Sequence, residues 1–152
     1  FNLDCSSNNL TSLNVSGATA LYQLSCGDNQ LTSLDVSNNT ALTTLICWNN
    51  QLTTLDVSQN TALTVLVCDD NQLTSLNVSN NTALTVLGCS DNQLTNLDVR
   101  NGNNTNITQF LSDFNPQLYC IDVDDANWSN IQANVPGWKI DPQSFFSEDC
   151  GM

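Results

Sequence analysis

Five cysteines recur every 21 residues, and thiols at fixed intervals can form disulfides, bind metal ions or fill a buried column. They are Cys5, Cys26, Cys47, Cys68 and Cys89. If the repeats stack as parallel coils, equivalent Cβ atoms lie ~4.8 Å apart, whereas a disulfide needs roughly 3.5–4.5 Å. We therefore expect a structural ladder of free, buried thiols and no metal site.

Two further columns carry amides and carboxylates. One follows each cysteine by three residues, at Asn8, Asn29, Asn50, Asn71 and Asn92. An inward-facing asparagine can bond the backbone groups that a turn leaves unpaired, in its own coil and the next, so this column is interpreted as structural. The other column comprises Asn14, Asp35, Asp56, Asn77 and Asp98. Carboxylates ~5 Å apart repel by about 3 kcal/mol at an effective dielectric of 20, which predicts acids that face water and bond to nearby Ser and Thr, with calcium as the alternative.

The composition excludes several kinds of function. Histidine is absent, which removes the commonest general base and the usual zinc ligand. Two basic residues against fifteen acidic ones give a formal charge of −13, which would repel phosphate backbones and anionic lipid headgroups. We expect no catalysis, no nucleic-acid partner and no direct membrane insertion.

The elements that position these columns follow from the repeat, which reads LxxLxCxxNxLTxLDVSxNTA and begins at Leu21, Leu42, Leu63 and Leu84. Apolar residues alternate in Leu45-Ile-Cys47 and in Leu55-Asp-Val57, as in strands with one buried face. A single coil cannot bury its own leucines, so only a stack is stable. The pattern predicts a β-rich solenoid of five or six coils.

The unit LxxLxCxxNxLxxLDV resembles the 21-residue leucine-rich repeat of bacteria, the IRREKO type, and the cysteine-bearing repeats of internalin J. The resemblance covers about two thirds of the chain. It implies a right-handed solenoid with a parallel sheet on one face. It also implies a role in binding other macromolecules at a bacterial surface.

The coils differ from one another mainly in the first half of the unit, at positions that flank the buried Leu and Cys. Strand alternation points these side chains away from the core. The expected binding surface has an apolar centre edged by acids: Ile46, Trp48, Val65, Val67, Asp69, Asp70, Val86 and Asp91, with Asp28 at the same edge. The second half hardly changes between coils, so we expect no discriminating surface there.

The period breaks after Arg100, which predicts a solenoid over residues 1–104 and a degenerate coil with a C-terminal cap over 105–152, in one domain overall. The cap is rich in aromatic residues, which would cover the open end: Trp128, Trp138, Phe145 and Phe146. A short helix is expected over Asn127–Asn134. The run Cys120–Asp125 with Phe146–Cys150 resembles the closing segment of leucine-rich repeat regions in secreted Bacteroidetes proteins, which implies export. In a secreted protein, Cys120 and Cys150 would join.

The leading hypothesis is a protein- or glycan-binding module of a secreted or surface-displayed bacterial protein, with a role in adhesion and as part of a larger exported chain. Its oligomeric state is left open. One alternative is a passive spacer, and another is an ice-binding solenoid that uses the row Thr11, Thr32, Thr53, Thr74 and Thr95. No cofactor is expected, although Asp122, Asp124 and Asp125 are close enough in sequence to suggest calcium without fitting an EF-hand loop.

Overall fold

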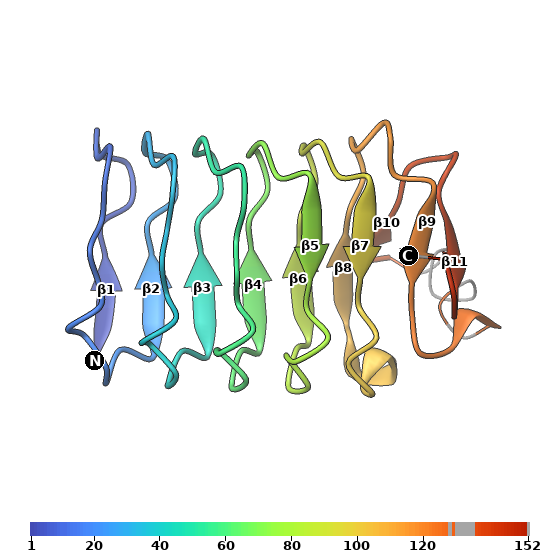
Figure 1. Cartoon of the computed structure of the whole chain (residues 1–152), viewed down its shortest axis with the longest axis horizontal. Helices are drawn as coiled ribbons and strands as arrows, with labels where there is room; N and C mark the ends of the chain where they lie inside the picture. The colour runs from blue at the N-terminus through green and yellow to red at the C-terminus, as the bar shows by residue number, and fades with distance from the viewer. Residues whose placement is uncertain (128, 130–135, 152) are drawn as a thin grey trace.

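The computed structural model describes residues 1–127, 129 and 136–151. The chain winds into a straight stack of coils, with the N-terminus at one end and the cap at the other (Figure 1). Most of the predicted helix over 127–134 lies outside the described residues, as does Trp128. No helix in the described part of the chain is long and apolar enough to cross a membrane. The β-solenoid expected from the repeat is confirmed.

One parallel sheet, sheet A, runs the whole length of the stack and is formed by the first half of each unit. Its seven strands, in spatial order, are β1 (Asn2–Asp4), β2 (Gln23–Ser25), β3 (Thr44–Ile46), β4 (Val65–Val67), β6 (Val86–Gly88), β8 (Gln109–Leu111) and β10 (Trp138–Lys139). The solenoid thus has about seven coils, and the prediction of five or six was too low because the cap adds a strand. We number the coils 1 to 7 by these strands.

A second parallel sheet, sheet B, is formed by the second half of the unit and is shorter. Its strands are β5 (Ser75–Asn77), β7 (Asn96–Asp98), β9 (Cys120–Asp122) and β11 (Phe145–Ser147). In coils 1 to 3 the corresponding segments carry no assigned strand. Sheet B therefore begins at coil 4, although the second-half sequences of coils 3 and 4 are nearly the same.

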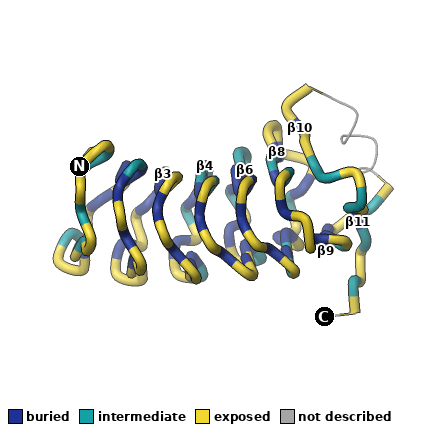
Figure 2. The backbone as a smooth tube through the Cα atoms, turned by 90° about the horizontal axis from the view of Figure 1, so that it is seen from above, coloured by how far each residue is buried: buried dark blue, intermediate teal, exposed yellow. Residues whose placement is uncertain are grey.

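The core lies between the two sides of each coil, where Figure 2 shows the buried backbone facing inward and exposed backbone at the bends. Leu24, Leu45, Leu66 and Leu87 are fully buried and pair in register along sheet A. Each strand has only three residues. Stacking identical leucines from coil to coil thus supplies the apolar burial that no short strand could obtain alone.

The polar insertion after Arg100 forms a 3-10 helix, Asn104–Asn106, and the cap then closes the stack. The ring of Trp138 stacks on Phe110 with centroids 5.0 Å apart, and Phe146 contacts both rings. Trp138 and Phe146 are buried, whereas Phe145 is 52 % exposed. Phe145 was expected to cover the open end, but strand alternation in β11 turns it outward.

Candidate interaction face

The outward side of sheet A gathers the apolar residues that differ from coil to coil. Val65 pairs with Thr44 on one side and Val86 on the other, and Val67 pairs with Ile46. Ile46, Val65, Val67 and Val86 are only half-buried. In-register pairing sets these side chains beside one another over coils 3 to 5, as the sequence predicted, and leaves a continuous apolar surface.

Trp48 lies beside this apolar group but leans toward the N-terminal end of the stack. A Cβ placed on Gly27 would lie 2.5 Å from Nε1 and 2.7 Å from Cδ1 of the indole, so the ring rests on the bare backbone of Gly27. Trp48 remains 38 % exposed. The sequence predicted Trp48 as a neighbour of the valines, and the missing side chain at Gly27 explains why the ring instead covers coil 2.

Asp69 leans the other way, toward coil 5. Its Oδ1 accepts a hydrogen bond from the backbone N–H of Ser90 at 2.8 Å, and a Cβ on Gly88 would lie 2.6 Å from Oδ2. Desolvation raises the pKa of Asp69, and the nearby carboxylates of Asp70 and Asp91 add to this. Asp69 was expected among the acids that edge the apolar surface, and its carboxylate lies half-buried over Gly88.

The other acids of this edge share a backbone requirement. Asp28, Asp70 and Asp91 have φ of 58°, 53° and 52°, and Asn49 occupies the same position with φ of 49°. Asn and Asp tolerate this left-handed conformation better than most residues. The turn therefore accounts for part of this acidity, and only the exposed carboxylates of Asp70 and Asp91 remain open to a partner.

The cysteine ladder lies inside the solenoid. Cys26, Cys47, Cys68 and Cys89 are buried free thiols, and Cys5 in the first coil is half-buried. Burial raises the pKa of Cys26 to about 12 and that of Cys47 well above its usual range. A thiol that stays protonated is a poor nucleophile and metal ligand, so the ladder serves as packing.

The asparagine column after each cysteine holds successive coils together. The Nδ2 of Asn50 lies 3.1 Å from the carbonyl oxygen of Cys26 and 3.2 Å from that of Cys47, and its Oδ1 accepts from Leu31 N–H at 2.9 Å. Asn29, Asn71 and Asn92 repeat this arrangement. Each of these asparagines bonds to the backbone of the preceding coil, whereas the sequence predicted bonds to the next coil. Asn8 bonds only carbonyls of its own coil, those of Cys5 and Ser6.

A second buried asparagine column was missed by the sequence interpretation. Asn39, Asn60 and Asn81 are fully buried, and the Nδ2 of Asn60 donates to the carbonyls of Val36 and Asn39. The recurrent asparagine of the SxNTA segment was the available signal. It was overlooked because a polar residue in a turn segment resembles ordinary loop composition.

The acids of the second half of the unit form local turns. Asp35 accepts from the N–H of Ser37 and Asp56 from that of Ser58, both at 2.9 Å. Hydrogen bonding from these serines lowers the pKa of both carboxyls. The Asp98 carboxylate forms the same turn with the N–H of Arg100 at 3.0 Å and also accepts two hydrogen bonds of 2.9 and 2.8 Å from the Arg100 guanidinium, which lowers its pKa.

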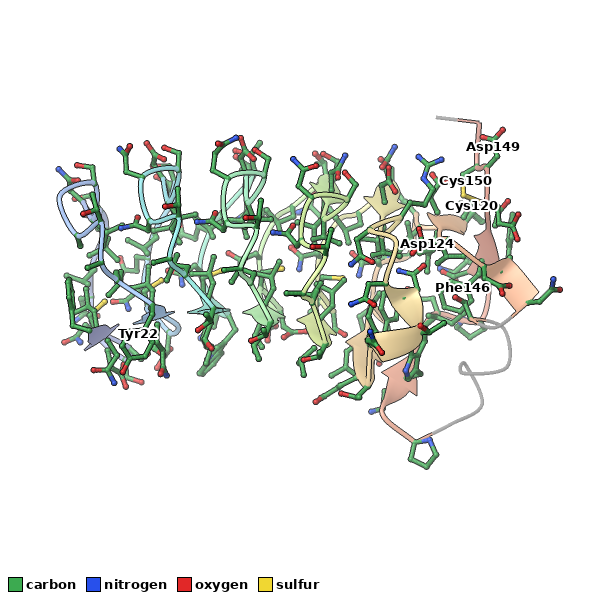
Figure 3. The ribbon with its side chains drawn as sticks, turned by 90° about the horizontal axis from the view of Figure 1, so that it is seen from below. Tyr22, Cys120, Asp124, Phe146, Asp149 and Cys150 are labelled. Carbon is green, nitrogen blue, oxygen red and sulfur yellow. A yellow bond between two sulfur atoms is a disulfide. The ribbon has the colours of Figure 1, made fainter. Side chains whose placement is uncertain are left out.

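The cap residues are tied by a covalent link. Cys120 and Cys150 form a disulfide with a Cα–Cα distance of 5.8 Å, next to Asp149 in Figure 3. The buried Asp122 accepts from the N–H of Cys150 at 2.8 Å and faces Arg100 at 3.6 Å. Asp124 accepts from the backbone of the polar insertion. Within the described ranges no three His, Cys, Asp or Glu side chains converge as a metal site.

The threonine row does not lie on one continuous sheet. Its members Thr11, Thr32, Thr53, Thr74 and Thr95 are all exposed. Strands are assigned on this side from coil 4 onward, where the N–H of Thr95 donates to the carbonyl of Thr74. In coils 1 to 3 the backbone bonds next to the row run from Gln30 to Leu10 and from Gln51 to Leu31. The ice-binding alternative stays a prediction.

No protein-family model matches the sequence, and no curated protein matches it. Solved structures do match it. The functional domain of InlJ from Listeria monocytogenes, which includes a cysteine ladder, is similar with a TM-score of 0.66 and 29% identity over 97% of this chain. The internalin InlF of the same organism gives a TM-score of 0.70 at 20% identity over 93% of this chain.

A leucine-rich repeat protein of Leptospira interrogans also matches, with a TM-score of 0.56 and 19% identity over 95% of this chain. The chain spans 39%, 47% and 49% of these three structures, which is less than half of each. The fold is thus that of bacterial leucine-rich repeat proteins, and the resemblance expected from the repeat is confirmed. The likeness of the cap to Bacteroidetes proteins remains a prediction.

Proposed function

We propose that this leucine-rich repeat solenoid is a non-enzymatic module that binds a protein partner through the outward side of sheet A. The observation that carries the proposal is the apolar surface of Ile46, Val65, Val67 and Val86 beside the half-exposed ring of Trp48. Residues with a structural role are constant from coil to coil. These residues vary, and large apolar side chains clustered on an exposed sheet mark contact surfaces more often than scattered ones do.

The chemistry of the partner follows from the charges around this surface. Asp70 and Asp91 are exposed at its edge, and the whole chain carries a formal charge of −13. A partner with an apolar centre and a basic margin fits this arrangement, because opposite charges at the rim speed association and exclude acidic competitors. Contact with the apolar side chains of this surface supplies the affinity.

We further propose that the protein acts in adhesion, outside the cell or at its surface. The Cys120–Cys150 disulfide supports this location, because disulfides persist in oxidising compartments. The absence of histidine from the sequence supports a non-enzymatic role. A glycan partner on the same face is the alternative outcome of the experiment below.

The experiment compares how variants on the outward side of sheet A and a variant on the opposite side of the coil retain extracellular proteins. Immobilised wild type, Trp48→Ala and Val67→Asp are used to capture extracellular proteins, with Thr32→Asp on the opposite side of the coil as the matched control. We expect a protein retained by wild type and Thr32→Asp to be lost from both sheet A variants, with all four folded by circular dichroism. Equal capture by wild type and Val67→Asp would contradict the proposal, and a glycan retained in place of a protein would change the class of partner.

A further inference from the structure

A pocket of about 350 Å³ opens on the second-half side of the solenoid, between coils 3 and 4. β5 forms one wall, and it is the edge strand of sheet B (Figure 1). Segment 54–58 of coil 3 forms the other wall and carries no assigned strand. The pocket is lined by Thr54, Leu55, Asp56, Ser58, Ser75, Asn77, Ser79 and Asn80. The half of the unit expected to lack a distinctive surface is hollowed where its sheet pairing ends.

Two side chains in the pocket are held in fixed orientations by their own turns. Asp56 uses Oδ1 to accept from the N–H of Ser58 at 2.9 Å, and the side chain of Ser58 also hydrogen-bonds to this carboxylate, which keeps further lone pairs for a ligand. Asn77 uses Oδ1 to accept from the N–H of Ser79 at 2.9 Å and from its hydroxyl at 2.6 Å. Because Oδ1 must accept, the amide cannot be flipped, and Nδ2 presents its two donors. The pocket thus offers a fixed acceptor and a fixed donor on adjacent coils.

We propose that this pocket binds one ring of a neutral saccharide, with Asp56 accepting from one hydroxyl and Asn77 donating to the adjacent hydroxyl oxygen. Vicinal hydroxyls supply the donor and the acceptor that these two groups require. The volume is at the small end of the range for small-molecule sites, which suits one ring rather than a longer chain. This site lies apart from the sheet A face and does not depend on it.

Other occupants fit the pocket less well. Calcium takes six to eight oxygen ligands and favours several carboxylates, whereas Asp56 is the only acid in the lining. An acidic sugar would meet an Asp56 whose pKa is lowered by the N–H of Ser58 and which is therefore ionised at neutral pH. A peptide strand could not pair along β5, because the edge is three residues long and coil 3 lies against it.

Neighbouring coils show why the position between coils 3 and 4 is distinctive. Between coils 2 and 3 the equivalent pair is Asp35 and Asp56. Hydrogen bonds from Ser58 lower the pKa of Asp56, and the nearby Asp35 carboxylate offsets a part of this lowering. Between coils 4 and 5 the equivalent pair is Asn77 and Asp98, on the paired strands β5 and β7. There the Asp98 carboxylate already accepts two hydrogen bonds from the guanidinium of Arg100. Between coils 1 and 2 an amide and an acid, Asn14 and Asp35, also occupy equivalent positions. What sets the place between coils 3 and 4 apart is the pocket, whose one wall is β5 at the edge of sheet B.

The test uses isotope-labelled protein titrated with glucose, galactose, mannose and N-acetylglucosamine, and with glucuronate as an acidic probe. We expect at least one neutral sugar to shift the backbone amide signals of Asp56 and Asn77, with a Kd on the order of 1 mM. Asp56→Asn should weaken this binding about tenfold or more, because it replaces an acceptor by a donor. It should also fold, because Asn14 and Asn77 form the same turn at this position of the unit. Glucuronate should leave the signals unchanged.

Asp35→Asn is the matched control, since it makes the same change one coil away and outside the pocket lining. It should leave sugar binding unchanged, and so should Trp48→Ala, which tests the sheet A proposal separately. The inference is overturned if none of the neutral sugars shifts these signals at millimolar concentration, if glucuronate binds as well as they do, or if Asp35→Asn weakens binding as much as Asp56→Asn does.

Discussion

The solenoid has two sides made from one 21-residue unit: the first side, formed by the first half of each unit, carries sheet A, and the second side, formed by the second half, carries sheet B. The two sides are built differently. On the first side, sheet A pairs every coil, and its outward residues vary: Thr44, Val65 and Val86 occupy one row. On the second side, the residues scarcely vary, and strand pairing is confined to coil 4 and beyond. The comparison indicates that the continuous sheet, together with the buried ladders, is the scaffold on which variation can be tolerated.

The largest expected effect tests what holds the second side together. Sheet B ends in β11, which pairs with β9, and the disulfide joins Cys120 of β9 to Cys150, just after β11, across a sequence separation of 30 residues. Replacing both cysteines by serine should cost about 3–4 kcal/mol of unfolding free energy. Hydrogen exchange should quicken in β9, β7 and β5 more than in β2 and β3. Uniform acceleration over both sheets would show that the two sides do not differ in this way.

A second expected effect compares the buried ladder with the outer column of one coil. Asn71→Ala leaves the buried N–H of Leu52 without its partner and takes one of two asparagine donors from each of the carbonyls of Cys47 and Cys68, at a cost of about 2–3 kcal/mol. Asn77→Ala removes only exposed bonds to Ser79 and should cost under about 0.5 kcal/mol. Urea denaturation measures both. Similar losses would remove the distinction between scaffold and surface.

The third expected effect concerns the contact between the Trp48 ring and the backbone of Gly27 on the sheet A side. Gly27→Ala introduces a Cβ into the space of the indole, so the ring must move outward at a cost of about 1 kcal/mol. Gly17→Ala, where nothing lies within 4 Å of the added Cβ, is the control. The indole Nε1–H signal of Trp48 in NMR spectra should shift in the first variant alone. An unmoved signal would mean that the ring does not rest on Gly27.

The smallest expected effect contrasts the acids of the two sides. Desolvation raises the pKa of Asp69, so its contribution to stability is present below the unfolded value of about 3.9 and falls as the pH rises through the folded value. Hydrogen bonding lowers the pKa of Asp35 and Asp56, so their contribution is present above the unfolded value and is lost as the pH falls through the folded one. Carboxyl carbon NMR should give a higher midpoint for Asp69. A common midpoint for all three acids would contradict this contrast.

Much of the fold followed from periodicity, because a leucine and a cysteine at fixed places leave one way to stack the coils. The position at which sheet B begins did not, since Thr54-Leu55-Asp56 and Ser75-Leu76-Asn77 are nearly equivalent and only the second is a strand. The candidate face was located by strand alternation. The opposite tilts of Trp48 and Asp69 depend on Gly27 and Gly88 in neighbouring coils, and contacts between coils are not visible in a single unit.

The central claim is that a protein partner contacts the outward side of sheet A. Photo-cross-linking tests it most directly: benzoylphenylalanine replaces Val67 in one variant and Thr32, on the other side, in a second. After illumination with extracellular proteins, we expect a discrete cross-linked protein from position 67 that Trp48→Ala diminishes, and none from position 32. The same cross-linked product from both positions, or from position 32 alone, would contradict it.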